Sequence, residues 1–204
     1  MMNIAIASGK GGTGKTTIAL ALAHYMSEQG DQVQLIDTDV EEPNVNLFLK
    51  APISEKVTLY SMVPQINMDL CIGCGFCENI CEFSSIVLVN NKPLVFPMMC
   101  HSCGGCFRVC PEKAITEINR EIGVMESGTL GKIDFIGGRL HINEPMSPPL
   151  IKQVKKHINP SIVSIIDSPP GTSCPVISAL NGMDFVVLVT EPTPFGLHDF
   201  KLVV

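Results

Sequence analysis

The sequence of 204 residues predicts an α/β fold: a parallel sheet with helices on both faces, interrupted by a small α+β insert. Short apolar runs, typical of buried parallel strands, alternate with segments whose apolar residues follow a helical period. Between residues 61 and 117 this alternation stops, and eight of the nine cysteines fall there in two tight groups. We therefore expect a main domain in two parts, 1–60 and 118–204, separated by an inserted domain at 61–117.

The first part of the main domain is predicted to run strand, helix, strand. Residues 3–7 are a short apolar run that ends in Ser-Gly, as a buried strand before a turn would. Residues 16–29 show helical spacing of apolar side chains, and Gly30 provides a stop. Residues 33–37 predict a second strand that ends in an acid, and residues 45–49 predict a short helix.

The second part of the main domain continues the same alternation. Residues 161–167 and 184–190 predict two hydrophobic strands, each followed by a loop rich in proline or glycine. Residues 174–182 lie between them and predict a helix, which is terminated by the Asn-Gly pair at its end. Residues 118–150 predict only strands or loops, whereas residues 198–204 follow a helical pattern.

The composition argues against several classes of protein. A formal charge of −6 argues against a nucleic-acid binder, which needs a clustered basic face. No apolar run reaches 18 residues, so no membrane span is expected. The N-terminus lacks the basic leader of a secretory signal, and the cysteine spacing is too short and regular for a disulfide framework. We expect a cytoplasmic protein whose cysteines bind metal.

Residues 9–16, GKGGTGKT, match the phosphate-loop pattern G-x-x-x-x-G-K-[ST] between a predicted strand and a predicted helix. Glycines let backbone N–H groups curl around phosphates at the helix N-terminus. Lys15 would reach the β- and γ-phosphates, and the Thr16 hydroxyl would ligate Mg²⁺. The bland alternative is a glycine-rich turn with a chance lysine. The predicted nucleotide-binding residues are Gly9, Lys10, Gly11, Gly12, Thr13, Gly14, Lys15, Thr16, Thr17 and Gly171.

The grouped cysteines form two copies of C-x2-C-x2-C-x3-C, which begin at Cys71 and Cys100. This is the two-cluster pattern of bacterial ferredoxins, in which the fourth cysteine of each run binds the other cluster. The predicted ligands are Cys71, Cys74, Cys77 and Cys110 for one [4Fe–4S] cluster, and Cys100, Cys103, Cys106 and Cys81 for the other. Structural zinc is the alternative, although its ligands usually come as two separated C-x2-C pairs. His101 is not expected to be a ligand of either cluster.

A second lysine in the phosphate loop, Lys10, gives the sequence a family resemblance. With this lysine the chain resembles the deviant-Walker ATPases, the family of division-site and chromosome-partitioning ATPases and of the nitrogenase iron protein. The resemblance implies an ATP-sandwich dimer in which Lys10 reaches the nucleotide of the other subunit. It also implies ATP and Mg²⁺ as ligands, and Lys10, Lys15 and Asp39 as catalytic residues.

Two further segments resemble the switches of that family. Residues 37–44, DTDVEEPN, resemble switch I, where Asp39 would position the attacking water and Asp37 would lie near the metal. Residues 167–173, DSPPGTS, resemble switch II, where Asp167 would hold Mg²⁺ and Gly171 would sense the γ-phosphate. The expected magnesium site therefore contains Thr16, Asp37 and Asp167. A loop or helix cap is the bland alternative for each acid alone.

The whole chain resembles the subgroup of these ATPases that carries an inserted two-cluster ferredoxin domain. In that family further strands and helices follow the point at which this sequence ends, and they supply adenine contacts. The resemblance therefore leaves phosphate binding expected and base-selective binding in doubt.

The function expected from both patterns is a dimeric, ATP-hydrolysing switch with two [4Fe–4S] clusters. It would couple the nucleotide cycle to electron transfer, or to delivery of an iron–sulfur or other metal cluster. The expected partners are a second copy or a related ATPase, and a redox or metal-cluster protein. Two rivals remain: a positioning ATPase whose clusters sense redox state or support the fold, and a ferredoxin-type electron carrier with a regulatory nucleotide site.

The ninth cysteine, Cys174, stands seven residues after Asp167. The nitrogenase iron protein has a cluster-ligating cysteine at this offset from its switch II acid, but residues 111–173 contain no companion cysteine. Cys174 is expected to be either a small buried residue at a helix start or a thiol that contacts a transferred cluster.

Overall fold

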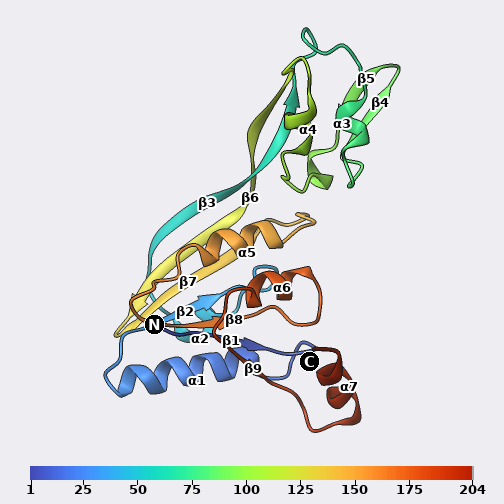
Figure 1. Cartoon of the computed structure of the whole chain (residues 1–204). Coiled ribbons are helices and arrows are strands. Elements are labelled where there is room, and N and C mark those ends of the chain that lie inside the picture. The colour runs from blue at the N-terminus through green and yellow to red at the C-terminus, as the bar shows by residue number, and fades with distance from the viewer. Residues whose placement is uncertain (204) are drawn as a thin grey trace. The chain divides into compact units, whose positions relative to one another are not determined.

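The computed structural model describes residues 1–203 (Figure 1). Its elements are β1 (Asn3–Ala7), α1 (Lys15–Glu28), β2 (Val33–Asp37), α2 (Val45–Leu49), β3 (Ile53–Ile66), α3 (Phe76–Asn79), β4 (Ile86–Val89), β5 (Lys92–Val95), a 3-10 turn (Pro97–Met99), α4 (Gly105–Val109), β6 (Ile115–Leu130), β7 (Ile133–Leu140), α5 (Pro148–Lys155), β8 (Val163–Asp167), α6 (Cys174–Leu180), β9 (Phe185–Leu188) and α7 (Pro194–Val203).

The chain divides into two compact units, which are described separately. The main unit holds Met1–Leu59, Gly123–Ile142 and the residues from Met146 onward. The second unit holds Tyr60–Ile122 together with the short segment Asn143–Pro145. Each boundary near 60 and 122 falls within a long strand, β3 or β6.

The sheet has the strand order β3-β6-β7-β2-β8-β1-β9. Strands β7, β2, β8, β1 and β9 pair in parallel, and β6 pairs with β7 in the antiparallel sense. The α/β fold with a mostly parallel sheet is therefore confirmed. In the register of β2 and β8, Asp37 lies opposite Asp167, so two acids meet at the carboxyl end of the sheet.

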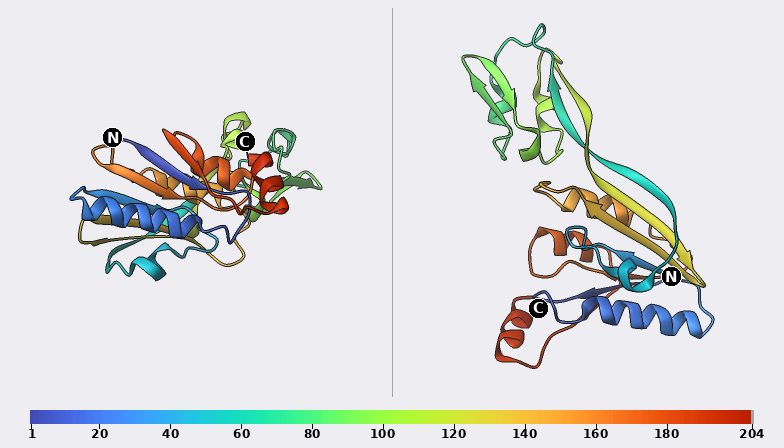
Figure 2. Two further views of the ribbon diagram at one scale, coloured as in Figure 1. Left: turned by 90° about the horizontal axis from the view of Figure 1, so that it is seen from below. Right: turned by 180° about the vertical axis from the view of Figure 1, so that it is seen from behind.

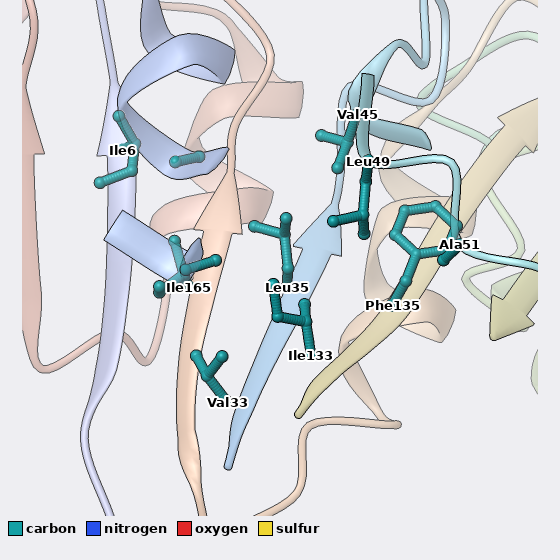
Figure 3. Packing of buried hydrophobic residues seen from close by; sticks show 11 residues of the cluster. Ile6, Val33, Leu35, Val45, Leu49, Ala51, Ile133, Phe135 and Ile165 are labelled. Carbon is teal, nitrogen blue, oxygen red and sulfur yellow. The ribbon is translucent and has the colours of Figure 1, made fainter. Parts of the chain in front are cut away.

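The central strands β1, β2 and β8 form because their apolar runs are buried within the sheet. All five residues of β2 are buried, and successive side chains point to opposite faces. Leu35 and Ile165 pack in one cluster with Ala19 and Ala23 of α1 (Figure 3). The small alanine side chains let α1 approach the sheet closely. The views in Figure 2 show α1 running along the sheet, and α5 and α6 as separate helices of the same unit.

The bounds expected for elements of the main unit hold to within about two residues, except that α7 begins at Pro194, four residues before the expected start at 198. No element was predicted for β3 or α5. The strand expected at 161–167 begins at Val163, and the one expected at 184–190 covers only Phe185–Leu188. The expectation of only strands or loops over 118–150 was incomplete. Strands β6 and β7 cover most of that range, but α5 begins within it, at Pro148. Of the helical pattern at 198–204, residue 204 lies outside the described residues.

The second unit repeats its own backbone at an interval of 29 residues. Gly75 and Gly104 both adopt left-handed conformations, with φ of 81° and 69°, directly before α3 and α4. Left-handed backbone also recurs at Gly73 and Ser102 and at Ser84 and Lys113. The sequence repeat is thus a structural repeat, because its halves place their turns and helices at matching positions.

No helix among the described residues is long and apolar enough to cross a membrane.

Candidate functional site

The phosphate loop joins the end of β1 to the start of α1 in the main unit. Gly14 has φ of 94°, a left-handed conformation that favours glycine, and α1 begins at the next residue, Lys15. The first N–H groups of a helix have no partner within the helix, and its dipole favours an anion there. The hydroxyl of Thr13 is buried without a hydrogen-bond partner among residues 1–203. The loop can therefore offer donors to a phosphate chain.

The other predicted nucleotide residues lie around the same loop. Gly9, Lys10, Gly11 and Gly12 precede Gly14 in the chain, and Thr16 and Thr17 are in the first turn of α1. Gly171, with φ of 97°, donates its N–H to the carbonyl of Ser8 at 3.0 Å. This bond brings the segment 167–173 against the entry to the phosphate loop.

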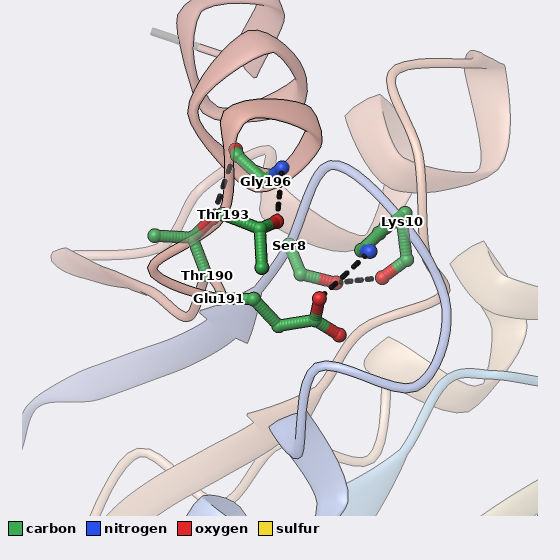
Figure 4. A network of polar contacts seen from close by, with 6 residues as sticks. All are labelled: Ser8, Lys10, Thr190, Glu191, Thr193 and Gly196. Atoms are coloured by element: carbon green, nitrogen blue, oxygen red, sulfur yellow. Dashed lines mark hydrogen bonds and ion pairs between the residues drawn. The ribbon is translucent and has the colours of Figure 1, made fainter.

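Lys10 is engaged within its own chain (Figure 4). Its Nζ lies 2.9 Å from Oε2 of Glu191, and both side chains are roughly a third exposed. Glu191 comes from the loop after β9. Hydrogen bonds order this loop: Thr190 Oγ1 donates to the carbonyl of Gly196, the Gly196 N–H donates to Thr193 Oγ1, and the Thr193 N–H donates to the carbonyl of Glu191. The lysine that distinguishes this phosphate loop is thus held by a carboxylate 181 residues away.

Three acids gather at the carboxyl ends of β2 and β8. Asp37 accepts the N–H of Asp39 at one oxygen, and the N–H groups of Asn44 and Val45 at the other, each at 3.0 Å. Oδ2 of Asp167 accepts the Thr16 hydroxyl at 2.6 Å. Oδ1 of Asp167 is buried and has no hydrogen-bond partner in the described chain.

The electrostatics of these acids follow from burial and crowding. Burial first, and then the charge of Asp167, raises the pKa of Asp37 to about 8. Burial raises the pKa of Asp167 to about 6 against the Thr16 hydrogen bond and the charge of Lys15. Burial likewise raises the pKa of Asp39 to about 6, again opposed by Lys15. Buried carboxylates that repel each other are stabilised by a nearby cation.

A magnesium ion fits this arrangement through Thr16 and Asp167. Mg²⁺ prefers carboxylate and other oxygen ligands, and it usually keeps several of its waters. The unpartnered Oδ1 of Asp167 and the adjacent Thr16 hydroxyl supply such oxygens. Both oxygens of the third predicted ligand, Asp37, already accept backbone N–H groups. Asp37 therefore orders the backbone of residues 39–45 beside the other two residues of the predicted site.

Two residues of this site were not identified from the sequence. The Asn44 side-chain oxygen lies 3.1 Å from the Thr16 hydroxyl, and Glu191 pairs with Lys10. Asn44 belongs to the segment DTDVEEPN, in which the sequence analysis assigned roles only to acidic residues. Glu191 lies shortly after β9, whereas Asp37 and Asp167 are the last residues of β2 and β8, so an acid at or just after the end of an apolar run was the available signal.

The second unit contains two cavities, and each is lined by four cysteines. The first is lined by Cys71, Cys74, Cys77 and Cys110. The second is lined by Cys81, Cys100, Cys103 and Cys106. Each cavity takes three cysteines from one run and the last cysteine of the other run. The structure thus brings together the same two sets of four that the sequence pattern groups; their binding of clusters stays a prediction.

The cysteine sets differ in arrangement from a site for a single metal ion. No three His, Cys, Asp or Glu side chains among residues 1–203 converge on the position of one metal ion. The four ligands of a [4Fe–4S] cluster would each bind a different iron atom, so such a cluster does not require the four sulfurs to converge on one point. His101 also lines the second cavity, where its ring stacks on Phe83 with centroids 3.5 Å apart.

The two cysteines that cross between the runs accept hydrogen bonds at sulfur. Sγ of Cys81 accepts the N–H of Ser85 at 3.3 Å and lies 3.0 Å from the Ser85 hydroxyl. Sγ of Cys110 accepts the N–H of Ala114 at 3.3 Å. Burial raises the pKa of the Cys81 thiol, but the Ser85 hydroxyl and nearby backbone N–H groups outweigh it, and the net pKa is lowered.

The ninth cysteine, Cys174, is the first residue of α6, and its side chain is exposed. Its place at a helix start agrees with the sequence pattern. The alternative that it is a small buried residue is wrong for this structure.

Comparisons with known proteins place the chain among nucleotide-binding domains. Residues 4–184 match the family model described as the CobQ/CobB/MinD/ParA nucleotide binding domain. An uncharacterized protein of Methanocaldococcus jannaschii is 39% identical over 98% of this chain and 71% of its own length. A second uncharacterized protein of that organism is 30% identical over 100% of this chain and 74% of its own length.

A solved structure shares the fold. The septum site-determining protein MinD of Pyrococcus horikoshii OT3, complexed with Mg-ADP, has a TM-score of 0.53 and 19% identity to this chain. The match covers 97% of the present chain but 61% of that structure. The chain thus spans less than two thirds of the length of this structural neighbour.

Proposed function

Because the chain belongs to the CobQ/CobB/MinD/ParA nucleotide-binding domain family, we propose that it is a Mg-ATP-dependent switch carrying two [4Fe–4S] clusters. The switch couples ATP binding and hydrolysis to electron transfer or to delivery of a metal cluster to a partner protein. One observation carries the proposal: a chain with a complete phosphate loop also has two cavities, each lined by four cysteines.

In this proposal the main unit binds the nucleotide through its phosphates. Backbone N–H groups of residues 9–16 and the Lys15 ammonium neutralise and orient the phosphate chain. Thr16 and Asp167 hold Mg²⁺, which supplies charge stabilisation to the transferred phosphoryl group. Asp39, whose pKa of about 6 leaves it ionised above neutral pH, orients the attacking water.

Lys10 gives the switch its dimeric state. We propose that this lysine reaches the nucleotide of a second subunit, where it stabilises charge on the phosphoryl group. The ion pair with Glu191 occupies the Lys10 ammonium within one chain. Dimerisation therefore requires Lys10 to leave Glu191, and the pair opposes dimer formation.

The second unit supplies the redox function. Cys71, Cys74, Cys77 and Cys110 would hold one cluster, and Cys81, Cys100, Cys103 and Cys106 the other. When bound, each cluster accepts and releases single electrons. The cysteine thiolates bind the iron atoms, and the backbone and Ser85 donors described above stabilise negative charge on two of the sulfurs.

Metal content tests the cluster assignment directly. Protein prepared without oxygen should contain about eight iron and eight sulfide per chain, and reduction should produce an EPR signal. Because Cys81 lines the cavity of the second run, Cys81→Ser should damage the cluster of Cys100, Cys103 and Cys106. Loss of the other cluster instead would refute the crossed assignment, and zinc in place of iron would refute the redox function.

A positioning ATPase is the second candidate, because the matching family model is named in part for MinD and ParA. In that case the clusters sense redox state or support the fold, and turnover does not depend on electron flow. A ferredoxin-type electron carrier with a regulatory nucleotide site would show no turnover at all.

A further inference from the structure

We propose that the hydroxyl of Ser85 raises the reduction potential of the second cluster above that of the first, so that electrons pass from the first cluster to the second. The inference rests on the proposed function, because it requires both clusters. It assigns Ser85 as a positioning residue that acts through the Cys81 sulfur.

The geometry around Cys81 carries the proposal. The Ser85 hydroxyl lies 3.0 Å from Cys81 Sγ, and the Ser85 N–H points to the same sulfur at 3.3 Å. A cysteine bound to iron is a thiolate and has no proton to donate, so the hydroxyl must be the donor. Ser85 is only 3% exposed, and water therefore competes little for this bond.

The internal repeat provides the comparison with the first cluster. Cys110 occupies the position of Cys81 in the other half, and Ala114 occupies that of Ser85. Cys110 accepts the Ala114 N–H at 3.3 Å, the same bond at the same length as in the first half. Alanine has no hydroxyl, so the two crossing cysteines differ by one O–H···S hydrogen bond.

One added hydrogen bond at sulfur shifts the potential in a known direction. Reduction places one electron on a cluster, and the cluster with its four thiolates gains one negative charge. A donor at a ligand sulfur stabilises the more negative state, and hydrogen bonds to the sulfurs are among the factors that set cluster potentials. The second cluster should therefore be reduced first.

A redox titration followed by EPR, with dithionite as the electron donor, tests the proposal on two reciprocal variants. The wild-type protein should show two midpoint potentials. Ser85→Ala should lower the higher midpoint potential by about 59 mV, which corresponds to about a tenfold change in the equilibrium constant for one-electron reduction. Ala114→Ser adds the missing hydroxyl to the other half, and it should raise the lower potential while leaving the higher one in place.

The outcomes separate this inference from the proposed function. Ser85→Thr keeps the hydroxyl and should stay near the wild-type potentials with full iron content. The inference is overturned if Ser85→Ala keeps its iron and leaves both midpoint potentials unchanged. It is also overturned if only the lower of the two midpoint potentials falls. If Ser85→Ala does not assemble its cluster, Ala114→Ser decides alone, and an unmoved lower potential contradicts the proposal. Wild-type protein without clusters instead contradicts the proposed function.

Discussion

At the scale of single residues, the nucleotide site is a set of charges held close together before any ligand arrives. Asp37 and Asp167 lie opposite each other in the register of β2 and β8, and burial raises the pKa values of both. The free site therefore stores electrostatic repulsion that a bound cation relieves. Lys10 and Glu191 attract each other instead, and the proposed function requires this ion pair to open.

The raised pKa values predict that the ligand-free protein loses stability as pH rises. The ordinary pKa of an aspartate is 3.8, whereas Asp167 reaches about 6 and Asp37 about 8 when folded. Between these values the native state binds more protons than the unfolded chain, so the free energy of unfolding falls from about pH 4 to about pH 8. Asp167→Asn keeps an acceptor for Thr16 but removes the charge, and it should stabilise the free protein at pH 8 by about 1–3 kcal/mol.

Urea unfolding at pH 5 and pH 8, with and without Mg-ADP, measures this effect. Mg-ADP should stabilise the wild type at pH 8 far more than the Asp167 variant, because the variant lacks the anionic ligand. Asp31→Asn, at an exposed position, is the control and should change neither value. Equal stability of wild type and Asp167→Asn at pH 8 would contradict the repulsion.

The Lys10–Glu191 pair predicts a variant that dimerises more readily. Glu191→Gln removes the charge that holds Lys10 at 2.9 Å and should increase the fraction of dimer with ATP about two- to fivefold, since a partly exposed ion pair contributes up to about 1 kcal/mol. Sedimentation with and without ATP measures it. Lys10→Ala should bind ATP as a monomer without dimerising, whereas Lys15→Ala should not bind it. A dimer fraction unchanged in Glu191→Gln would show that the pair does not restrain Lys10.

At the scale of elements, helix α6 connects the acid at Asp167 to the packing of α5. Lys155 of α5 donates from Nζ to the carbonyls of Ser178, Ala179 and Asn181 at 2.8, 2.7 and 2.6 Å. These carbonyls lie at the C-terminal end of α6, where a helix has unpaired acceptors and favours a cation. Burial lowers the pKa of Lys155, which agrees with its position against the helix end.

Lys155→Met should therefore cost about 1–3 kcal/mol of unfolding free energy, because three carbonyls lose a charged donor. Lys152→Met, at an exposed position on the same helix, is the matched control and should change stability by less than about 0.5 kcal/mol. Urea denaturation of both variants provides the comparison. A similar loss in both would mean that the α6 carbonyls do not depend on Lys155.

The same elements show what a sequence can predict. The order of strands and helices, the phosphate loop and the acids that follow strands depend on local patterns, and the fold agrees with them. Glu191 and the Lys155 contacts depend on residues that are remote in the chain, as the separation of 181 residues between Lys10 and Glu191 shows. The α5 helix was not predicted, and Pro148 and Pro149 at its start resemble a loop. In fact, proline fits the first turn of a helix.

At the scale of the whole molecule, the chain combines two compact units with separate chemistry. The main unit has the family's nucleotide-binding fold, and the second unit repeats one half-structure around two cysteine cavities. The grouping of cysteines followed from the two-cluster ferredoxin pattern that their spacing matches, in which the fourth cysteine of each run binds the other cluster. The difference between Ser85 and Ala114 gained meaning only when the structure placed the hydroxyl beside Cys81.

The central claim is that the nucleotide cycle and the clusters are coupled, and the rate of ATP hydrolysis in the two redox states tests it most directly. Protein with full iron content would be assayed without oxygen after reduction by dithionite and after oxidation, with Mg²⁺ and saturating ATP. We expect the rates of the two states to differ by at least severalfold. The difference should vanish in Cys81→Ser, which damages one cluster. Equal rates in the reduced and oxidised wild type would contradict the coupling and favour a positioning ATPase.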